Sequence, residues 1–397
     1  MQQVQTDSQA REALLDAAQA MQGTLRARSA ACNAGRSVPA ETIEDFRNAG
    51  FFRMLQPRRY GGLELSPSVF YEVNLALARA CPSSAWVMAV VGVHNWQLAL
   101  FDARAAEDVW GDEPATLISS SYAPVGRIRA VDGGYRLSGK YSFSSGCQHC
   151  DWVMLGGIVP DAESGAMDMK NFRTFLLPAA DYRIEENWDV IGLKGTGSHD
   201  VVVEDAFVPA YRTHGIMDAF RCDSPGNAVN SQPLYRLPWQ QVFVRAVSNA
   251  TLGACEAVLD EFISLCDARV VMGRKLRDDD HAKNLIARVS NELANTRCVM
   301  HAHFDQMLQL ATAGQPIPVA DRVRYRYESA AIARRCLDLS TDMLTLSGSA
   351  GIRQDSRLLA LHLDILASQA HIANYTVPLG INMGGTLLGG DTSDYGI

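Results

Sequence analysis

The order of patterns along the chain predicts a mostly helical α+β protein in three parts. Apolar residues recur at helical spacing up to about residue 112, alternate with period two from about 116 to 209, and return to helical spacing from about 239 to 387. A connection rich in Gly, Pro and Asn separates the last two parts. We therefore expect an N-terminal helical domain over 1–113, a central β-barrel-like domain over 114–215 and a C-terminal helical bundle over 216–397. This order excludes a Rossmann fold, in which strands and helices alternate.

Local start and stop signals support the N-terminal helices. The first helix is expected to begin at Asp7 or Ser8, which are good N-cap residues. A second helix is expected to begin after Pro39 and to end near Gly50. Ser66-Pro67 marks the beginning of another helix.

The β part and the bundle have signals of their own. "GRIRAVDGGYRLSGKYSF" alternates around Asp132-Gly133-Gly134, which predicts a hairpin. Long segments such as "DRVRYRYESAAIARRCLDLSTDMLTLS" predict long antiparallel helices. The basic run from Arg322 to Arg326 alternates with apolar residues, so we expect it to lie on a solvated helix face.

Composition narrows the classes of function. The net charge of -8, with no basic stripe to offset it, argues against nucleic acid as a partner. The longest apolar stretch, "AWVMAVVGVHNWQLALF", carries central polar residues, which argues against a membrane span. The N-terminus lacks the apolar core of a signal peptide, so we expect a cytoplasmic protein whose nine cysteines are reduced.

The segment "KYSFSSGCQHCDW" raises two alternatives for a site. Cys147 and Cys150 form a CxxC pair around His149, but a structural zinc site needs four ligands, and no second pair completes one. A thioredoxin-type pair belongs in a βαβ unit, whereas this pair lies between β segments. We interpret these cysteines as packing residues and expect no metal site. The alternative places the chemistry at Ser144 and Ser145.

Two further features are weak when each is taken alone. The Gly-rich stretch Gly192–Ser198 has neither the Walker spacing nor the dinucleotide spacing, although its amides and hydroxyls could line a cofactor. His94 and His371 each lie in apolar helical surroundings, where a lone histidine is more often a core residue than a catalyst.

The combination of segments is more specific than any one of them. "GFFRMLQPRRYGGLE", "SSSYAP", "DGGYRLSGKYSFSSGC", "GLKGTGSHDVVVEDAFVP" and "SGSAGI" together resemble the acyl-CoA dehydrogenase superfamily across nearly the whole chain. Within it, "VGVHNWQLALFDARAAEDVW", "ISSSYAP" and "NSQPLYRLPW" resemble the two-component flavin-dependent aromatic monooxygenases, which include the 4-hydroxyphenylacetate and secosteroid phenol hydroxylases.

The resemblance implies both an architecture and an activity. It implies N-terminal helices, a β domain and a four-helix bundle, assembled as a homotetramer. It implies an oxygenase component that takes reduced FMN or FAD from a separate flavin reductase, which alone uses NADH. With O2 the flavin would form a C4a-hydroperoxyflavin that hydroxylates a phenolic or indole-like substrate, ortho to the hydroxyl group of a phenol. The chain itself has no nicotinamide fingerprint.

The resemblance also implies roles for individual residues. His94 and Ser120 would hold the phenolic oxygen, Ser145 would donate to the flavin N5 edge, and His371 would lie near flavin C4a. His94 is expected to have a pKa near neutrality, as suits a group that deprotonates a phenol. The substrate pocket would also contain Trp86, Trp239 and Phe243. The remaining flavin contacts would be Tyr122, Ala123, Phe143, Ser144, Lys194, Gly195, Thr196, Ser198, Arg269 (from a neighbouring subunit), Gly348 and Gly351.

Departures from the family pattern keep alternatives open. "LHLDILASQAH" lacks a histidine that often precedes the catalytic one, and Gln240 stands where one relative has an arginine near the flavin. An acyl-CoA dehydrogenase is an alternative, but "HIANYTVPLG" lacks the carboxylate base that such an enzyme needs. An N- or S-oxygenase on the same fold is a second alternative, and a non-catalytic flavin-binding protein is a third.

Overall fold

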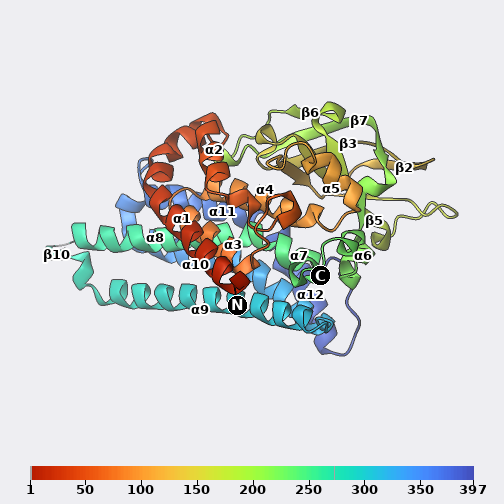
Figure 1. Cartoon of the computed structure of the whole chain (residues 1–397). Coiled ribbons are helices and arrows are strands. Elements are labelled where there is room, and N and C mark those ends of the chain that lie inside the picture. The colour runs from red at the N-terminus through yellow and green to blue at the C-terminus, as the bar shows by residue number, and fades with distance from the viewer. Residues whose placement is uncertain (1, 272) are drawn as a thin grey trace.

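The computed structural model describes residues 2–271 and 273–397, and in it helices flank a pair of small sheets (Figure 1). This is the predicted mostly helical α+β architecture. The residue boundaries of the three domains stay a prediction. The N-terminal helices are α1 (Gln2–Gly35), α2 (Ala40–Asn48), α3 (Pro67–Ala78), α4 (Pro82–Leu98) and α5 (Ala103–Trp110).

The predicted helix boundaries in this part are mostly confirmed. Ser66 Oγ accepts a hydrogen bond from the Ser68 amide at 3.2 Å and caps α3. Gly50 follows α2 with a left-handed φ of 77°, which glycine adopts without strain. The expected start of the first helix at Asp7 or Ser8 is wrong, because α1 begins at Gln2. Residues 2–6 contain no Gly or Pro, so nothing there interrupts the helix.

Two four-stranded sheets form the β domain. One has the order β1 (Ile118–Ser121), β4 (Trp152–Ile158), β5 (Phe172–Pro178) and β8 (Thr213–Gly215). The other has the order β2 (Arg127–Val131), β3 (Gly134–Ser144), β7 (His199–Pro209) and β6 (Tyr182–Glu185). The predicted hairpin is confirmed, since β2 and β3 pair antiparallel with Val131 opposite Gly134.

The helices after the β domain include the predicted long ones. They are α6 (Ile216–Arg221), α7 (Trp239–Phe243), α8 (Arg245–Ala268), α9 (Asp280–Thr312), α10 (Val319–Gly351), α11 (Arg357–Gln369) and α12 (Thr376–Leu387). A two-residue ribbon, β9 (Val270–Val271) with β10 (Arg274–Lys275), joins α8 to α9. The solvated face expected at Arg322–Arg326 is wrong. Arg322 and Arg326 are each 6% exposed, because they lie four residues apart on the inner face of α10.

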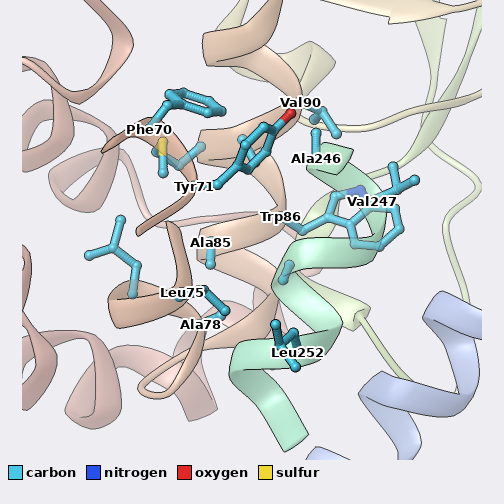
Figure 2. Close-up of a cluster of buried hydrophobic side chains, with 14 of the residues drawn as sticks. Phe70, Tyr71, Leu75, Ala78, Ala85, Trp86, Val90, Ala246, Val247 and Leu252 are labelled. Atoms are coloured by element: carbon cyan, nitrogen blue, oxygen red, sulfur yellow. The ribbon is translucent and has the colours of Figure 1, made fainter. Parts of the chain in front are cut away.

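Buried apolar side chains from α3, α4 and α8 pack together into a core (Figure 2). A Cβ on Gly92 would lie 2.8 Å from the Phe70 ring, and one on Gly253 would lie 2.7 Å from Leu75 O. Both glycines therefore allow close helix contact. Of the described helices, Trp239–Ala268 alone is long and apolar enough to span a membrane. Some 83% of its most apolar window is buried in the protein, as in a core helix.

Candidate active site

A cavity of about 430 Å³ lies where α4, the β domain and the bundle helices meet. Its walls are mainly aromatic and aliphatic, and none of the described residues that line it is an aspartate or a glutamate. The lining comprises Trp86, Val90, Ser120, Ser121, Tyr122, Ala123, Pro124, Ser142, Phe143, Ser145, Trp239, Gln240, Phe243, Val244, Val247, Arg326, His371, Ile372 and Ala373.

The cavity brings together many of the residues that the sequence singled out. Those that line it are Trp86, Ser120, Tyr122, Ala123, Phe143, Ser145, Trp239, Phe243 and His371. His94 and Ser198 do not line the cavity but contact residues that do, namely Phe243 and Ser145, and Thr196 in turn contacts Ser198.

An irregularity at the end of β3 exposes Ser145 to the cavity. The register between β3 and β7 shifts between Tyr141 and Ser144, as in a β-bulge. Phe143 has a φ of 69°, an unusual value for a residue with a side chain. At this irregularity Phe143 and Ser145 line the cavity, whereas Ser144 between them is fully buried.

Ser145 belongs to a continuous chain of hydrogen bonds, here called the hydroxyl chain. Trp86 Nε1 lies 3.1 Å from Ser145 Oγ, which lies 2.7 Å from Ser198 Oγ. Ser198 Oγ lies 2.7 Å from Thr196 Oγ1, and Thr196 donates to the carbonyl oxygen of Leu193 at 2.9 Å.

The chemistry of its ends fixes the direction of the hydroxyl chain. A carbonyl only accepts, so the single hydroxyl proton of Thr196 is committed to Leu193, and Ser198 must donate to Thr196. Ser145 must then donate to Ser198, while it accepts from the indole N–H of Trp86. Toward the cavity Ser145 therefore offers a lone pair. The resemblance implied a donor at this position, and the role of Ser145 toward a flavin stays a prediction.

The Gly-rich stretch Gly192–Ser198 holds Leu193, the residue at which the hydroxyl chain ends. Leu193 has a left-handed φ of 52°, and its amide donates to Asp364 Oδ1 at 2.6 Å. Burial raises the pKa of Asp364 to about 7. A Cβ on Gly195 would lie 2.2 Å from Cys32 Sγ, so the loop lies directly on α1. Lys194 is exposed to solvent, and neither it nor Gly195 lines the cavity.

His94 is held as a neutral acceptor. Its Nδ1 lies 2.7 Å from the Ile118 carbonyl and must carry the proton, so Nε2 has a free lone pair. Nε2 is buried and has no hydrogen-bond partner in the described part of the chain. Burial lowers the pKa of His94 to about 4, so the expected near-neutral pKa is wrong. The ring stacks against Phe243 at 6.0 Å, outside the cavity lining.

His371 has the opposite tautomer. Its Nδ1 accepts a hydrogen bond from the Ala373 amide at 3.1 Å. Burial, together with the charge of Arg326, lowers the pKa of His371 to about 4. The neutral ring therefore carries its proton on Nε2 and offers an N–H donor. It lies edge-on to Trp86, with ring centroids 5.7 Å apart.

Trp239, Phe243 and Tyr122 form an aromatic wall of the cavity. Trp239 and Phe243 stack at 5.8 Å between ring centroids, and Tyr122 meets Phe243 edge-on at 4.8 Å. Such faces bind a flat ring by stacking and exclude water from it.

Sequence reasoning missed Arg326, which also lines the cavity. Its Nε donates to Gln240 Oε1 at 2.9 Å. The available signal was its spacing: positions 322, 326 and 330 fall on one face of α10, and all three are buried. Because basic and apolar residues alternate in this segment, the pattern predicts a solvated helix face instead.

Three of the predicted flavin contacts meet elsewhere. Arg269 donates to the Ser347 carbonyl, and a Cβ on Gly348 would lie 3.0 Å from the Arg269 guanidinium. Gly351 follows in the same turn of α10. None of the three lines the cavity, and Figure 1 places the β10 end of α8 across the molecule from β2.

The CxxC pair packs as a structural element. Cys147 is buried with Sγ 3.8 Å from Gly197 O, and Cys150 Sγ lies 3.4 Å from Gly146 O. His149 Nε2 lies 3.2 Å from Ser37 Oγ. Within residues 2–271 and 273–397, no cluster of His, Cys, Asp or Glu could hold a metal ion.

The cavity residues fit an isoalloxazine ring. A reduced flavin presents a flat ring system with an N–H at N5. The cavity supplies aromatic faces for the ring and an unpaired lone pair on Ser145 for an N–H. His371 adds a donor near the same wall.

Comparison with known proteins identifies the family of the chain. Residues 8–105 match the acyl-CoA dehydrogenase N-terminal domain and residues 246–375 match the acyl-CoA dehydrogenase C-terminal domain. The chain is 35% identical over 355 residues to the flavin-dependent monooxygenase, oxygenase subunit HsaA, of Rhodococcus jostii strain RHA1, covering 88% of this chain and 92% of that protein.

Two other comparisons agree. The chain is 37% identical over 240 residues to the oxygenase component of the FADH2-dependent resorcinol hydroxylase of a Rhizobium species, covering 60% of this chain and 58% of that protein. The crystal structure of 3-HSA hydroxylase from Rhodococcus sp. RHA1 superposes with a TM-score of 0.92 at 33% identity, covering 97% of this chain and 98% of that chain. The chain therefore belongs to the oxygenase subunits of the flavin-dependent monooxygenases, which share the acyl-CoA dehydrogenase fold.

Proposed function

We propose that this chain binds reduced FMN or FAD, delivered by a separate flavin reductase, and uses O2 to hydroxylate a phenolic or indole-like ring ortho to its hydroxyl group. The observation that carries the proposal is the cavity itself. It combines a hydrogen-bond acceptor for reduced flavin on the β-domain wall with an aromatic wall for a substrate ring. One oxygen atom of O2 enters the ring and the other leaves as water, with both electrons supplied by NADH through the reductase.

The residues on the β-domain wall would bind the flavin. When bound, reduced flavin supplies the activation of O2. Ser145 would accept from its N5–H, and the hydroxyl chain would hold that serine in place. The Nε2–H of His371 would stabilise negative charge that develops near the flavin. Aromatic side chains around the cavity would exclude water. This exclusion would limit side reactions of the activated oxygen before it reaches the substrate.

The substrate would be oriented by His94 and Ser120. The lone pair on His94 Nε2 has no partner in the described structure, so it is available to a phenolic O–H once Phe243 shifts. Ser120 lines the cavity from β1, two residues along the strand from Ile118, whose carbonyl holds the His94 ring. With its lowered pKa, His94 would orient the phenol as an acceptor and would remain neutral while it does so.

The cavity argues against the acyl-CoA dehydrogenase alternative. That reaction needs a carboxylate to remove the substrate α-proton, and the described lining contains no carboxylate. Ser120 and the aromatic wall would have no evident use in such an enzyme.

We further propose that the chain assembles as a homotetramer in the cytoplasm. Large apolar side chains are exposed along the last helical segment, at Ile372, Ile381, Leu387 and Leu388, with 72–91% of each accessible. Exposed apolar surface of this kind marks an interface. Arg269 would then reach a flavin phosphate in a neighbouring copy, because it does not line the cavity of its own chain.

The experiment combines the purified chain, a generic flavin reductase, NADH, ¹⁸O₂ and a panel of phenols and indole. We expect a hydroxylated product that carries one ¹⁸O atom, with FMN and FAD compared in parallel. If all electrons went to hydrogen peroxide across the panel and acyl-CoA thioesters were oxidised instead, the proposal would be overturned.

A further inference from the structure

Arg326 places a positive charge in the cavity wall, and among the described residues no carboxylate forms an ion pair with it. The residue is 6% exposed, and its Nη1 is buried with no hydrogen-bond partner in the described part of the chain. Its one hydrogen bond to a described residue joins Nε to Gln240 Oε1. No described carboxylate oxygen lies within 4.0 Å of the guanidinium, the limit for an ion pair. A buried charge left in this state destabilises the fold.

A neighbouring arginine shows how such a charge is otherwise satisfied. Arg322, one turn earlier on α10, is buried to the same extent. Its Nε donates to Ile317 O at 2.9 Å and its Nη1 to Phe220 O at 2.6 Å, and it does not line the cavity. Arg326 differs from Arg322 both in its missing partners and in its access to the cavity.

Gln240 fixes the orientation of Arg326. The backbone N–H of Gln240 donates to the Gly396 carbonyl at 3.1 Å, and this bond anchors α7 to the C-terminal segment. A Cβ on Gly396 would lie 1.9 Å from Gln240 Nε2, so the glutamine side chain has little room to turn. Burial lowers the pKa of Arg326 to about 10, with Asp394 acting against this, and the group stays charged at neutral pH.

Arg326 lies on the aromatic side of the cavity, which favours the substrate as its partner, although its charge also lowers the pKa of His371, which the proposed function places near the flavin. Arg326 comes from α10 and bonds to the neighbour of Trp239, so it belongs to the helical, aromatic side of the cavity. The flavin-binding group Ser145 belongs to the β-domain side. A substrate ring stacked on the aromatic wall would place its remaining substituents along the same side of the cavity, where Arg326 lies.

We propose that Arg326 binds an anionic substituent, a carboxylate, on the aromatic substrate. This inference rests on the proposed function and narrows it to hydroxyaromatic acids. A guanidinium and a carboxylate form short, charge-assisted hydrogen bonds, and a ligand carboxylate would supply the partners that the protein withholds. A neutral substituent would leave the buried charge unbalanced.

The first test needs no variant. We would measure binding of 4-hydroxyphenylacetate and 3-(4-hydroxyphenyl)propanoate, each against its neutral amide, to the anaerobic complex of the intact protein with reduced flavin. We expect the better acid to bind about 10- to 100-fold more tightly than its amide, as for hydrogen bonds to a charged group. Equal affinity of acid and amide at both chain lengths would overturn the inference.

The second test uses variants of α10. Arg326→Met should abolish the preference for the acid, Arg326→Lys should keep part of it, and Arg324→Met should keep all of it. Arg324 is the matched control because its side chain is 43% exposed and pairs with Asp321 on the same helix. If Arg326→Met fails to fold, the lysine variant and the acid–amide comparison still decide the matter.

The outcomes separate this inference from the proposed function. Loss of reduced-flavin affinity in Arg326→Met, with the acid–amide ratio unchanged, would assign Arg326 to the flavin and overturn the inference alone. Preferential binding of acids without any ¹⁸O incorporation would overturn the proposed function while the carboxylate site stood.

Discussion

Thr196 donates its single hydroxyl proton to the carbonyl oxygen of Leu193 at 2.9 Å, and this contact sets the direction of the whole hydroxyl chain. Because each serine has one proton to give, Ser198 donates to Thr196 and Ser145 donates to Ser198. Ser145 is left as an acceptor toward the cavity. Reduced flavin has an N–H at N5, whereas oxidised flavin has a lone pair there. With Ser145 at the flavin N5 edge, as proposed, the arrangement would favour the reduced form.

Replacing Thr196 should relax this selection. In Thr196→Val the hydroxyl of Ser198 loses its acceptor and becomes free to donate to Ser145, whose own proton can then point into the cavity. We expect the ratio of reduced-flavin to oxidised-flavin affinity to fall about five-fold, the value of one neutral hydrogen bond. Fluorescence titration of oxidised flavin and anaerobic titration of reduced flavin measure the two affinities.

Thr196→Ser is the matched control, because it keeps the hydroxyl group that donates to Leu193 and loses only a methyl group. Its affinity ratio should equal that of the wild type. If the serine and valine variants changed the ratio equally, packing rather than hydrogen-bond direction would determine flavin selection.

His94 should act without a change in its own charge over the working pH range. Burial holds its pKa at about 4, so the ring is neutral at every pH above 6. We expect the pH profile of kcat/KM for phenols to show no titration of His94 near pH 6.5. The profiles of the wild type and of His94→Asn should therefore have the same shape in this range. Asparagine can still donate to the Ile118 carbonyl but lacks the acceptor at Nε2. We therefore expect kcat/KM to fall about 10-fold in this variant, the value of one lost hydrogen bond to the substrate.

Reduced-flavin binding is the control for the His94 variant. His94 lies behind Phe243, away from the hydroxyl chain, so the affinity for reduced flavin should stay within about two-fold of wild type. A matching loss of flavin affinity would mean that the substitution disturbs the cavity as a whole.

The architecture was readable from the sequence because its signals are local. The hairpin at Gly133 and the cap at Ser66 each depend on a few neighbouring residues, and both are confirmed. The hydroxyl chain depends on distant ones: Ser145 and Ser198 are 53 residues apart, and Leu193 and Asp364 are 171 apart. Sequence patterns cannot place such pairs at 2.7 Å and 2.6 Å from each other.

The same limit explains the other corrections. Tautomers and pKa values depend on burial and on hydrogen-bond partners, so the neutral state of His94 follows from the fold alone. Arg326 was predicted to be solvated because charged residues usually are, and only tertiary packing reveals that it is buried.

His214 should make the protein sensitive to acid. It lies on β8, outside the cavity, and burial lowers its pKa from 6.5 to about 3. Between these values the unfolded state binds a proton that the native state does not, so the free energy of unfolding falls as pH falls below 6.5. The contribution is about 2 kcal/mol between pH 6.5 and 5.

Urea unfolding followed by tryptophan fluorescence would measure this effect. His214→Gln keeps a polar group near Ser224, which lies 2.9 Å from His214 Nε2, but it does not titrate. Its stability should change less between pH 7 and 5 than that of the wild type. Parallel curves for the two proteins would contradict the assignment to His214.

Asp364 should act in the opposite direction. Burial raises its pKa from 3.8 to about 7, so over this window the native state keeps a proton that the unfolded state releases. Its contribution is complete below pH 3.8 and is lost as pH rises through 7. Asp364→Asn stays neutral and keeps an oxygen to accept from the Leu193 amide. At pH 8 we expect the variant to be more stable than the wild type by about 4 kcal/mol at most.

The effects of Asp364 and His214 overlap in pH, so each is measured as a difference between variant and wild type. For Asp364→Asn this difference should grow from pH 4 to pH 8. Asp364→Ala is the contrasting variant, because it removes the acceptor and releases the left-handed backbone at Leu193. It should weaken reduced-flavin binding through the hydroxyl chain, whereas Asp364→Asn should not. If both variants bound flavin equally well, the loop at Leu193 would not need Asp364 to hold Ser145 in position.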